Sequence, residues 1–185
     1  MDATLPDRLA EDLETAFESL VRGHQHLVYG IALRTLRHPQ DAQDVAQEVF
    51  VRAYRALCSY PRERIRELQP RPWLARITLN LCRNRLRSSP RRAESIDGAE
   101  AVRDLTAGPA EAWERRESAT RWQGLLATLP DHHRRAVELR HVEGLSYPEL
   151  ALALDRPLGT VKAQVHRGLR QLRAAWEAQE EEANR

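Results

Sequence analysis

The chain has 185 residues, of which 42% are hydrophobic and 30% charged, so it has enough apolar content to fold as one large domain or two small ones. Its 29 Lys and Arg residues nearly balance 27 Asp and Glu residues, but the arginines gather in two places and the acids in the segments that follow each of them. The first residues lack the apolar core of a signal peptide, and no run reaches the roughly 18 apolar residues of a membrane helix, which excludes a secreted or membrane-spanning chain and predicts a soluble, cytoplasmic one.

Residues 1–16 are expected to form a loose leader that runs into a long amphipathic helix. From Phe17 to Leu36, apolar residues recur at spacings of three, four and seven, which is the helical period. The next predicted helix, DAQDVAQEVFVRAYRAL, is capped by Asp41 and has polar side chains opposite an apolar stripe. That polar face is expected either to be solvated or to bind a protein partner, and spacing alone does not separate the two.

A third helix is predicted to start near Pro72, after a polar segment with several prolines. Its apolar side begins with Trp73 and Leu74, and its other sides become steadily more basic toward the end. Arginines interleaved with asparagines suit the phosphates and the base edges of a nucleic acid, respectively.

Cys58 and Cys82 have no CxxC spacing and are expected to be buried or half-buried thiols.

Residues 88–117 have no sustained apolar stripe and predict a flexible linker. The linker separates two predicted helical domains, residues 17–87 and 118–176, and an acidic tail follows at 177–185. In the second domain one helix is stopped by Pro130, and the next is capped by Asp131 and stops at Gly144. His132, His133 and His141 are expected at the surface or at its boundary. Because no strand pattern is present, the predicted fold is all-α, with two small helical domains.

The stretch from Leu145 to Trp176, LSYPELALALDRPLGTVKAQVHRGLRQLRAAW, predicts two helices joined by a tight turn. Ser146 and Glu149 match a capping box at the start of the first helix. The second helix restarts at Gly159 and has an apolar stripe of Val161, Val165, Leu169 and Leu172, with basic and polar residues around the rest. Helix, turn and basic helix is the layout of a helix-turn-helix DNA-binding element, although an ordinary helical hairpin with a solvated basic face fits the same spacing.

Neither a metal site nor a catalytic site is expected. His24 and His26 are two residues apart, so they point in different directions from a helix, and no Cys or carboxylate completes a ligand set. Asp44 and Glu48 are four apart, but no nucleophile or phosphate-binding loop accompanies them. The sequence therefore predicts no cofactor and no enzyme activity.

Three blocks of this sequence resemble bacterial RNA polymerase sigma factors. DAQDVAQEVFVRAYRAL and RPWLARITLNLCRNRLR resemble region 2 of that family, and LLATLPDHHRRAVELRHVEGLSYPELALALDRPLGTVKAQVHRGLRQLR resembles region 4. The blocks lie in the family's order and leave no room for the extra domains of housekeeping sigma factors, so the chain resembles the compact extracytoplasmic-function (ECF) type. The resemblance implies a non-enzymatic subunit that binds core polymerase and directs initiation at promoters. It also implies core polymerase (clamp helices and flap), promoter DNA and an anti-sigma factor as partners.

Site residues follow from the same resemblance. The polymerase-binding positions are Asp41, Asp44, Gln47, Glu48 and Phe50, the last more suited to packing. The positions for the unpaired downstream (−10) strand are Arg76, Asn80, Arg83, Asn84 and Arg87. The positions for the upstream (−35) element are Thr160, Lys162, Ala163, Gln164, His166, Arg167 and Arg170.

This sequence departs from the family at some of these positions. Asn84 stands where the family often has Asp, and Ala163-Gln164 replaces a commoner Ser-Arg pair, so the promoter preference does not carry over. Two other functions fit the residues alone less well. One is a stand-alone helix-turn-helix regulator, in which the Asp41–Phe50 face does not touch polymerase. The other is a helical enzyme that uses Asp44, Glu48 and the histidines.

Overall fold

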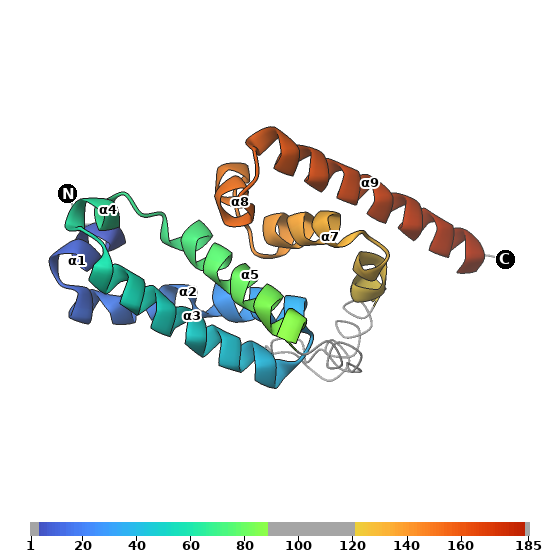
Figure 1. Ribbon diagram of the computed structural model, residues 1–185. Helices are drawn as coiled ribbons and strands as arrows, with labels where there is room; N and C mark the ends of the chain where they lie inside the picture. Colours follow the sequence, from blue (N-terminus) through green and yellow to red (C-terminus); the bar gives the residue numbers. More distant parts are fainter. Residues whose placement is uncertain (1–3, 89–120, 184–185) are drawn as a thin grey trace, which may run out of the picture. The chain divides into compact units, whose positions relative to one another are not determined.

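The computed structural model describes residues 4–88 and 121–183, and in these two ranges every regular element is a helix (Figure 1). The predicted all-α fold is therefore confirmed for the described residues. The chain divides into two compact units, one formed by residues 1–97 with Pro148–Asp155 and the other by residues 98–147 with 156–185. Nearly all of the predicted linker, residues 88–117, lies outside the described residues.

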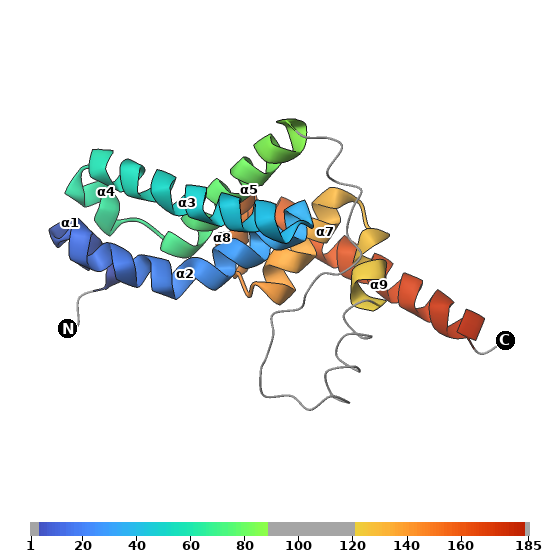
Figure 2. The same cartoon turned by 90° about the horizontal axis from the view of Figure 1, so that it is seen from below.

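The first unit is built on three long helices. These are α2 (Leu13–Leu36), α3 (Pro39–Ser59) and α5 (Pro70–Ser88), and each packs on the other two (Figures 1 and 2). Two short helices, α1 (Leu5–Glu11) and α4 (Arg62–Arg66), lie against each other, and α1 also packs on α2. Side chains spaced at helical intervals along all five helices form one hydrophobic core, as the apolar periodicity of the sequence predicts.

Specific polar residues determine where these helices begin and end. Asp12 separates α1 from α2, and its Oδ1 accepts a hydrogen bond of 3.2 Å from the backbone N–H of Thr15. Arg37 ends α2 in the left-handed conformation, with φ of 52°. The cap of α3 is His38, whose Nδ1 accepts from the N–H of Asp41 at 3.3 Å. The prediction that Asp41 itself is the cap was wrong, because α3 starts at Pro39, which needs no backbone partner in a first turn.

Two segments expected to be irregular contain short helices. The predicted leader includes α1, whose Leu9 and Ala10 are buried in the core. The proline-punctuated segment before α5 includes α4, in which Ile65 is buried, and α5 begins at Pro70 rather than near Pro72. Cys82 is buried as expected, but Cys58 is exposed, so the expectation for that thiol was wrong.

The second unit contains a helical segment at residues 121–127, followed by α7 (Asp131–Val137), the π-helical turn η2 (Glu138–Val142) and α9 (Leu158–Ala183). Its hydrophobic core joins Leu125, Leu129, Val137 and Leu172. The residue that caps α7 is Pro130, so Asp131 is its first residue and not the expected cap. Gly144, at φ of 68°, follows the π-helical turn, in agreement with the predicted stop.

His133 is buried, whereas a position at the surface or at its boundary was expected. It is 7% exposed, and its Nδ1 lies 2.9 Å from Oε1 of Gln171, so an N–H at Nδ1 can donate to that oxygen. The physical reason is that α7 packs on α9, which places residues 38 positions apart in direct contact. No local spacing could have indicated this pair.

The predicted order of helix, turn and helix near the C-terminus is present. The first helix, α8 (Tyr147–Leu154), buries Leu150 and Ala153. The helix is followed by Asp155, which has a left-handed backbone conformation with φ of 54°, so the chain turns sharply before Pro157. The second helix, α9, starts at Leu158, one residue before the expected restart at Gly159.

Candidate polymerase and nucleic-acid interfaces

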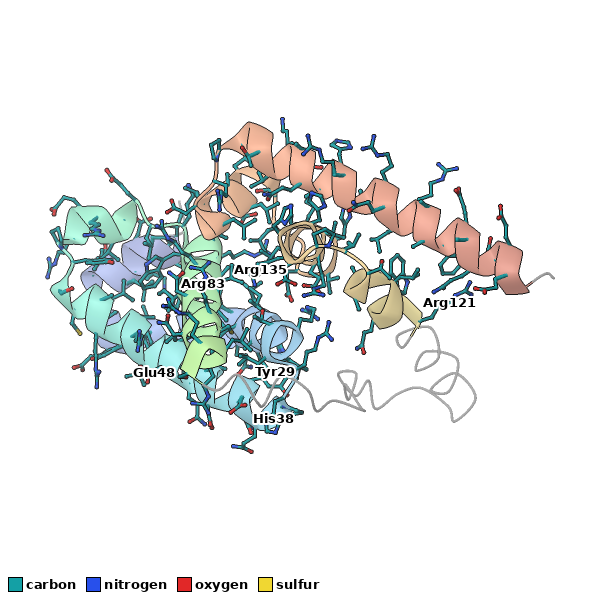
Figure 3. All side chains as sticks on the ribbon, turned by 45° about the vertical axis from the view of Figure 1, so that its right-hand side comes forward. Tyr29, His38, Glu48, Arg83, Arg121 and Arg135 are labelled. Carbon is teal, nitrogen blue, oxygen red and sulfur yellow. The ribbon has the colours of Figure 1, made fainter. Side chains whose placement is uncertain are left out.

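The polar face of α3 is exposed because its apolar stripe is fully used in the core. The stripe consists of Ala42, Val45, Val49, Ala53 and Leu57. Of the candidate polymerase-binding residues, Asp44 and Gln47 are exposed, and the half-buried Glu48 accepts a hydrogen bond of 2.7 Å from Nε of Arg52. Phe50 packs against the core, as expected for this position. Figure 3 shows the side chains of α3, with Glu48 labelled.

Asp41 differs from the other carboxylates of α3 because it is only 5% exposed. Its Oδ1 accepts a hydrogen bond of 2.6 Å from Nη2 of Arg85 in α5, and the same nitrogen donates to Oδ2 of Asp44 at 3.2 Å. The hydrogen bond to Asp41, followed by the charges of Asp41 and Asp44, raises the pKa of Arg85 above its ordinary value. Sequence analysis did not single out Arg85, since its partners lie 44 and 41 positions away.

The candidate residues for the −10 strand all lie on the exposed side of α5. The opposite side is buried and includes Leu74 and Thr78, whose hydroxyl donates to the backbone oxygen of Leu74 at 2.8 Å. Arg83, labelled in Figure 3, donates to Oδ1 of Asn80 at 3.4 Å. Arg76 is paired with Asp155, which belongs to the same compact unit, at 2.9 Å. The structure thus places arginine and asparagine side chains along one solvent-facing strip.

In α9, apolar and polar positions are sorted to opposite sides. The buried side consists of Val161, Val165, Gly168 and Leu172. The expected stripe had Leu169 in place of Gly168, and this was wrong, because Leu169 is 38% exposed. The candidate −35 residues Thr160, Lys162, Ala163, His166, Arg167 and Arg170 are all exposed, and Gln164 is half-buried. This exposed side offers cations, an imidazole and a methyl group near the N-terminal end of the helix, where a positive dipole favours phosphate.

Tyr147 is a further residue of this region that sequence analysis missed. Its ring centroid lies 5.0 Å from the guanidinium carbon of Arg140 and 5.8 Å from Nζ of Lys162. Arg140 also donates through Nη1 to the backbone oxygen of Leu145 at 2.9 Å, which connects η2 to the start of α8. Two cations on one ring form a cation–π arrangement that orients Lys162, one of the candidate −35 residues.

Two family models match separate parts of this chain. The family model "Sigma-70 region 2" matches residues 20–92, and "Sigma-70, region 4" matches residues 120–172. The RNA polymerase sigma-H factor of Pseudomonas aeruginosa is 34% identical over 176 residues, which cover 90% of this chain and 89% of that protein. The ECF RNA polymerase sigma-E factor of Escherichia coli K12 is 33% identical over 175 residues, with the same two coverages. The chain belongs to the ECF group of sigma factors.

A solved structure supports the same assignment for the fold of this sigma factor. CnrH, solved in complex with the cytosolic domain of CnrY, aligns with this protein at a TM-score of 0.68 and 25% sequence identity. The alignment covers 94% of this protein and 96% of CnrH. As a sigma factor, the protein directs core RNA polymerase to promoters, so the stand-alone regulator is not favoured.

Within residues 4–88 and 121–183, no group of three or more His, Cys, Asp or Glu residues could hold a metal ion. None of the helices in these ranges is long and apolar enough to cross a membrane.

Proposed function

We propose that this sigma factor binds core RNA polymerase through the exposed part of α3, namely Asp44, Gln47 and Glu48. Since the apolar side of α3 is used in the core, only its polar side is available to a partner. Carboxylates on a solvent-facing helix suit a partner with basic side chains, and their long-range attraction raises the rate of encounter. Asp41 and Phe50 support this surface from beneath, because both are turned toward the protein interior.

The exposed strip of α5 holds the unpaired −10 strand. Arg76, Arg83 and Arg87 supply charge for phosphates, while Asn80 and Asn84 can both donate and accept hydrogen bonds at base edges. The exposed side of α9 enters the major groove of the −35 element. The sorting of α9 into a fully buried apolar side and an exposed polar side is the observation that carries this proposal. A recognition helix needs such a division, since one side must pack while the other contacts DNA.

Two modest DNA sites on one chain reinforce each other. Once one site is bound, the other meets DNA at a high effective concentration, so each contact can be weak alone. The protein performs no bond chemistry and works where polymerase and DNA meet, in the cytoplasm. Since CnrH was solved bound to the cytosolic domain of CnrY, and the family resemblance implies an anti-sigma factor, we expect a protein of that kind to bind and inhibit this chain as well.

Run-off transcription tests the proposed function. Purified bacterial core polymerase is incubated with a library of promoter fragments, with and without the sigma factor. We expect transcripts that depend on the sigma factor and start at defined sites, which also reveal both promoter elements. The absence of such transcripts, together with the absence of binding to core polymerase in gel filtration, would overturn the proposal.

A second experiment separates the polymerase face from the DNA faces. Gln47→Ala and Asp44→Asn are expected to weaken binding to core polymerase, because both side chains are exposed on α3. Arg52→Gln serves as the comparison variant, because it removes a charge from the same helix at a residue that pairs with Glu48 at 2.7 Å. Equal losses of core binding in all three variants would contradict a specific role of Asp44 and Gln47, because these substitutions change the charge of α3 in different directions or not at all.

A further inference from the structure

Arg85 links the helix that we assign to polymerase with the helix that we assign to the −10 strand. Through Nη2, this residue of α5 donates to Oδ1 of Asp41 at 2.6 Å and to Oδ2 of Asp44 at 3.2 Å, both in the first turns of α3. The three side chains differ in their exposure to solvent: 8% of the Asp41 side chain is accessible, compared with 38% for Arg85 and 47% for Asp44. The contact with Asp41 is therefore shielded from water, while that with Asp44 lies at the surface.

A buried carboxylate is tolerated only when it is paired and hydrogen-bonded. Asp41 satisfies this condition through Arg85, which donates to its Oδ1 at 2.6 Å. Its position in the first turn adds favourable interaction with the N-terminal helix dipole, and Arg85 lies in the last turn of α5, where a cation is favoured. The link therefore joins the positive end of one helix to the negative end of another through oppositely charged side chains.

Arg85 points in a different direction from the neighbours that we assign to DNA. Arg83 and Arg87 are each two positions away, a spacing that places side chains on different sides of a helix. Both are exposed, as is Asn84, whereas Arg85 is half-buried against α3. The last described turns of α5 therefore have one arginine that holds the helix in place and two that face solvent.

We propose that Arg85 is a positioning residue for capture of the −10 strand. By holding Asp41 and Asp44, it keeps the end of α5 in one register on α3, so that Arg83, Asn84 and Arg87 meet the strand together. This inference rests on the proposed function, because it assumes that α5 holds the unpaired strand. Arg85 itself does not touch DNA.

The test uses holoenzyme assembled from full-length sigma factor and core polymerase. The probe is a single-stranded oligonucleotide with the non-template −10 sequence of a promoter found by run-off transcription. Arg85→Gln is expected to weaken oligonucleotide binding about tenfold, the scale of a lost charge-assisted hydrogen bond. Core binding should change less, since Arg85 contacts only one of the proposed core-binding residues, Asp44. Arg85→Lys keeps the charge but replaces the planar guanidinium with a compact ammonium group. The affinity of this variant for the oligonucleotide should therefore fall between those of Arg85→Gln and the wild type. The matched control is Arg22→Gln, which removes an exposed arginine paired with Glu18 on α2 and should bind like the wild type.

Asp41→Asn distinguishes positioning from simple loss of charge. This variant makes the protein more positive, so a purely electrostatic role of Arg85 predicts tighter binding of the oligonucleotide. The positioning role predicts weaker binding, and it predicts that Asp41→Asn combined with Arg85→Gln binds no more weakly than the worse single variant. All measurements are made below the melting temperature of each variant, so that unfolding does not contribute.

The inference is overturned if Arg85→Gln binds the oligonucleotide like Arg22→Gln, or if Asp41→Asn tightens binding. It is also overturned if Arg85→Gln weakens core binding and oligonucleotide binding in equal proportion, because the residue would then only support the fold. Failure of the proposed function has a different signature. In that case the wild-type protein itself gives no promoter-dependent transcript and no binding to core polymerase.

Discussion

A methyl group on Gly168 of α9 would lie 2.6 Å from Cγ2 of Val137 in α7. This distance is well below van der Waals contact, and Val137 is 4% exposed, so its side chain has little space to move. A valine in a helix also strongly prefers one χ1 rotamer. Glycine at position 168 therefore sets how closely α7 and α9 approach in the second unit.

Gly168→Ala is expected to destabilise the second unit. Overpacking of a core costs about 1–3 kcal/mol, and the better helix propensity of alanine offsets about 1 kcal/mol of this. The melting temperature of the second unit, measured by circular dichroism, should fall. Gly124→Ala is the matched control, since no atom lies within 4 Å of a Cβ at that position, and it should leave the melting temperature unchanged or raise it. Equal melting temperatures of the two variants would contradict the close approach.

Arg87→Ala is expected to change the salt dependence of −10 strand binding. Each phosphate contact to a single strand contributes about 0.7 to the slope of log K against log salt concentration. If Arg87 neutralises one phosphate, the slope for the holoenzyme and a −10 oligonucleotide should become shallower by about that amount. An unchanged slope with weaker affinity would mean that Arg87 acts without contacting a phosphate.

Arg167 and Arg170 are expected to contribute differently to −35 recognition. Loss of a bidentate base contact on Arg167→Ala should cost about 1–3 kcal/mol and relax the preference at one base pair. Arg170→Ala should weaken all sequences alike and reduce the salt slope by about 1, as expected for a phosphate contact. The measurement is holoenzyme affinity for promoter fragments with single substitutions in the −35 element. A uniform loss for both variants would remove Arg167 from base recognition.

Asp12 gives the first unit part of its pH dependence. Hydrogen bonding from Thr15 holds the pKa of this carboxyl below its ordinary value near 3.8. The stabilisation is thus fully present above that value and is lost as the pH falls through the lowered folded-state pKa. Asp12→Ala should lower the melting temperature at neutral pH, and the difference from wild type should shrink below about pH 3.8. Asp12→Asn, which keeps a capping oxygen, should melt near the wild type at neutral pH.

The long helices of this chain were predictable because periodicity is a local signal. Helices α2, α3 and α9 are 24, 21 and 26 residues long, and in each of them apolar residues recur every three or four positions, which leaves little choice of structure. The short helices α1 and α4 were missed for the opposite reason. Each spans fewer than two full turns and buries only one or two residues, so only packing on the rest of the unit stabilises it.

The errors at the candidate sites come from contacts between distant positions. Gly168 has no side chain and so was passed over in favour of Leu169, although the approach of α7 requires the glycine. The burial of His133 depends on Gln171, and that of Asp41 depends on Arg85. The sets of exposed polar residues on α5 and α9 were predictable from a helical wheel, whereas the partners of Asp41 were not.

The hydrophobic core of helices α1 to α5 shares no residue with the core that joins Leu125, Leu129, Val137 and Leu172. An all-or-none transition is therefore not the expected behaviour of the whole chain, and each core is expected to have a melting temperature of its own. The tryptophans offer a separate optical signal for each core. Trp73 packs at the first core, 6.4 Å from the ring centroid of Tyr60, and Trp176 packs at the second, with the guanidinium carbon of Arg121 3.8 Å above its ring. Trp73 is the only tryptophan in residues 1–97 of the sequence, so its replacement with phenylalanine should remove the fluorescence change of the first transition and leave that of the second.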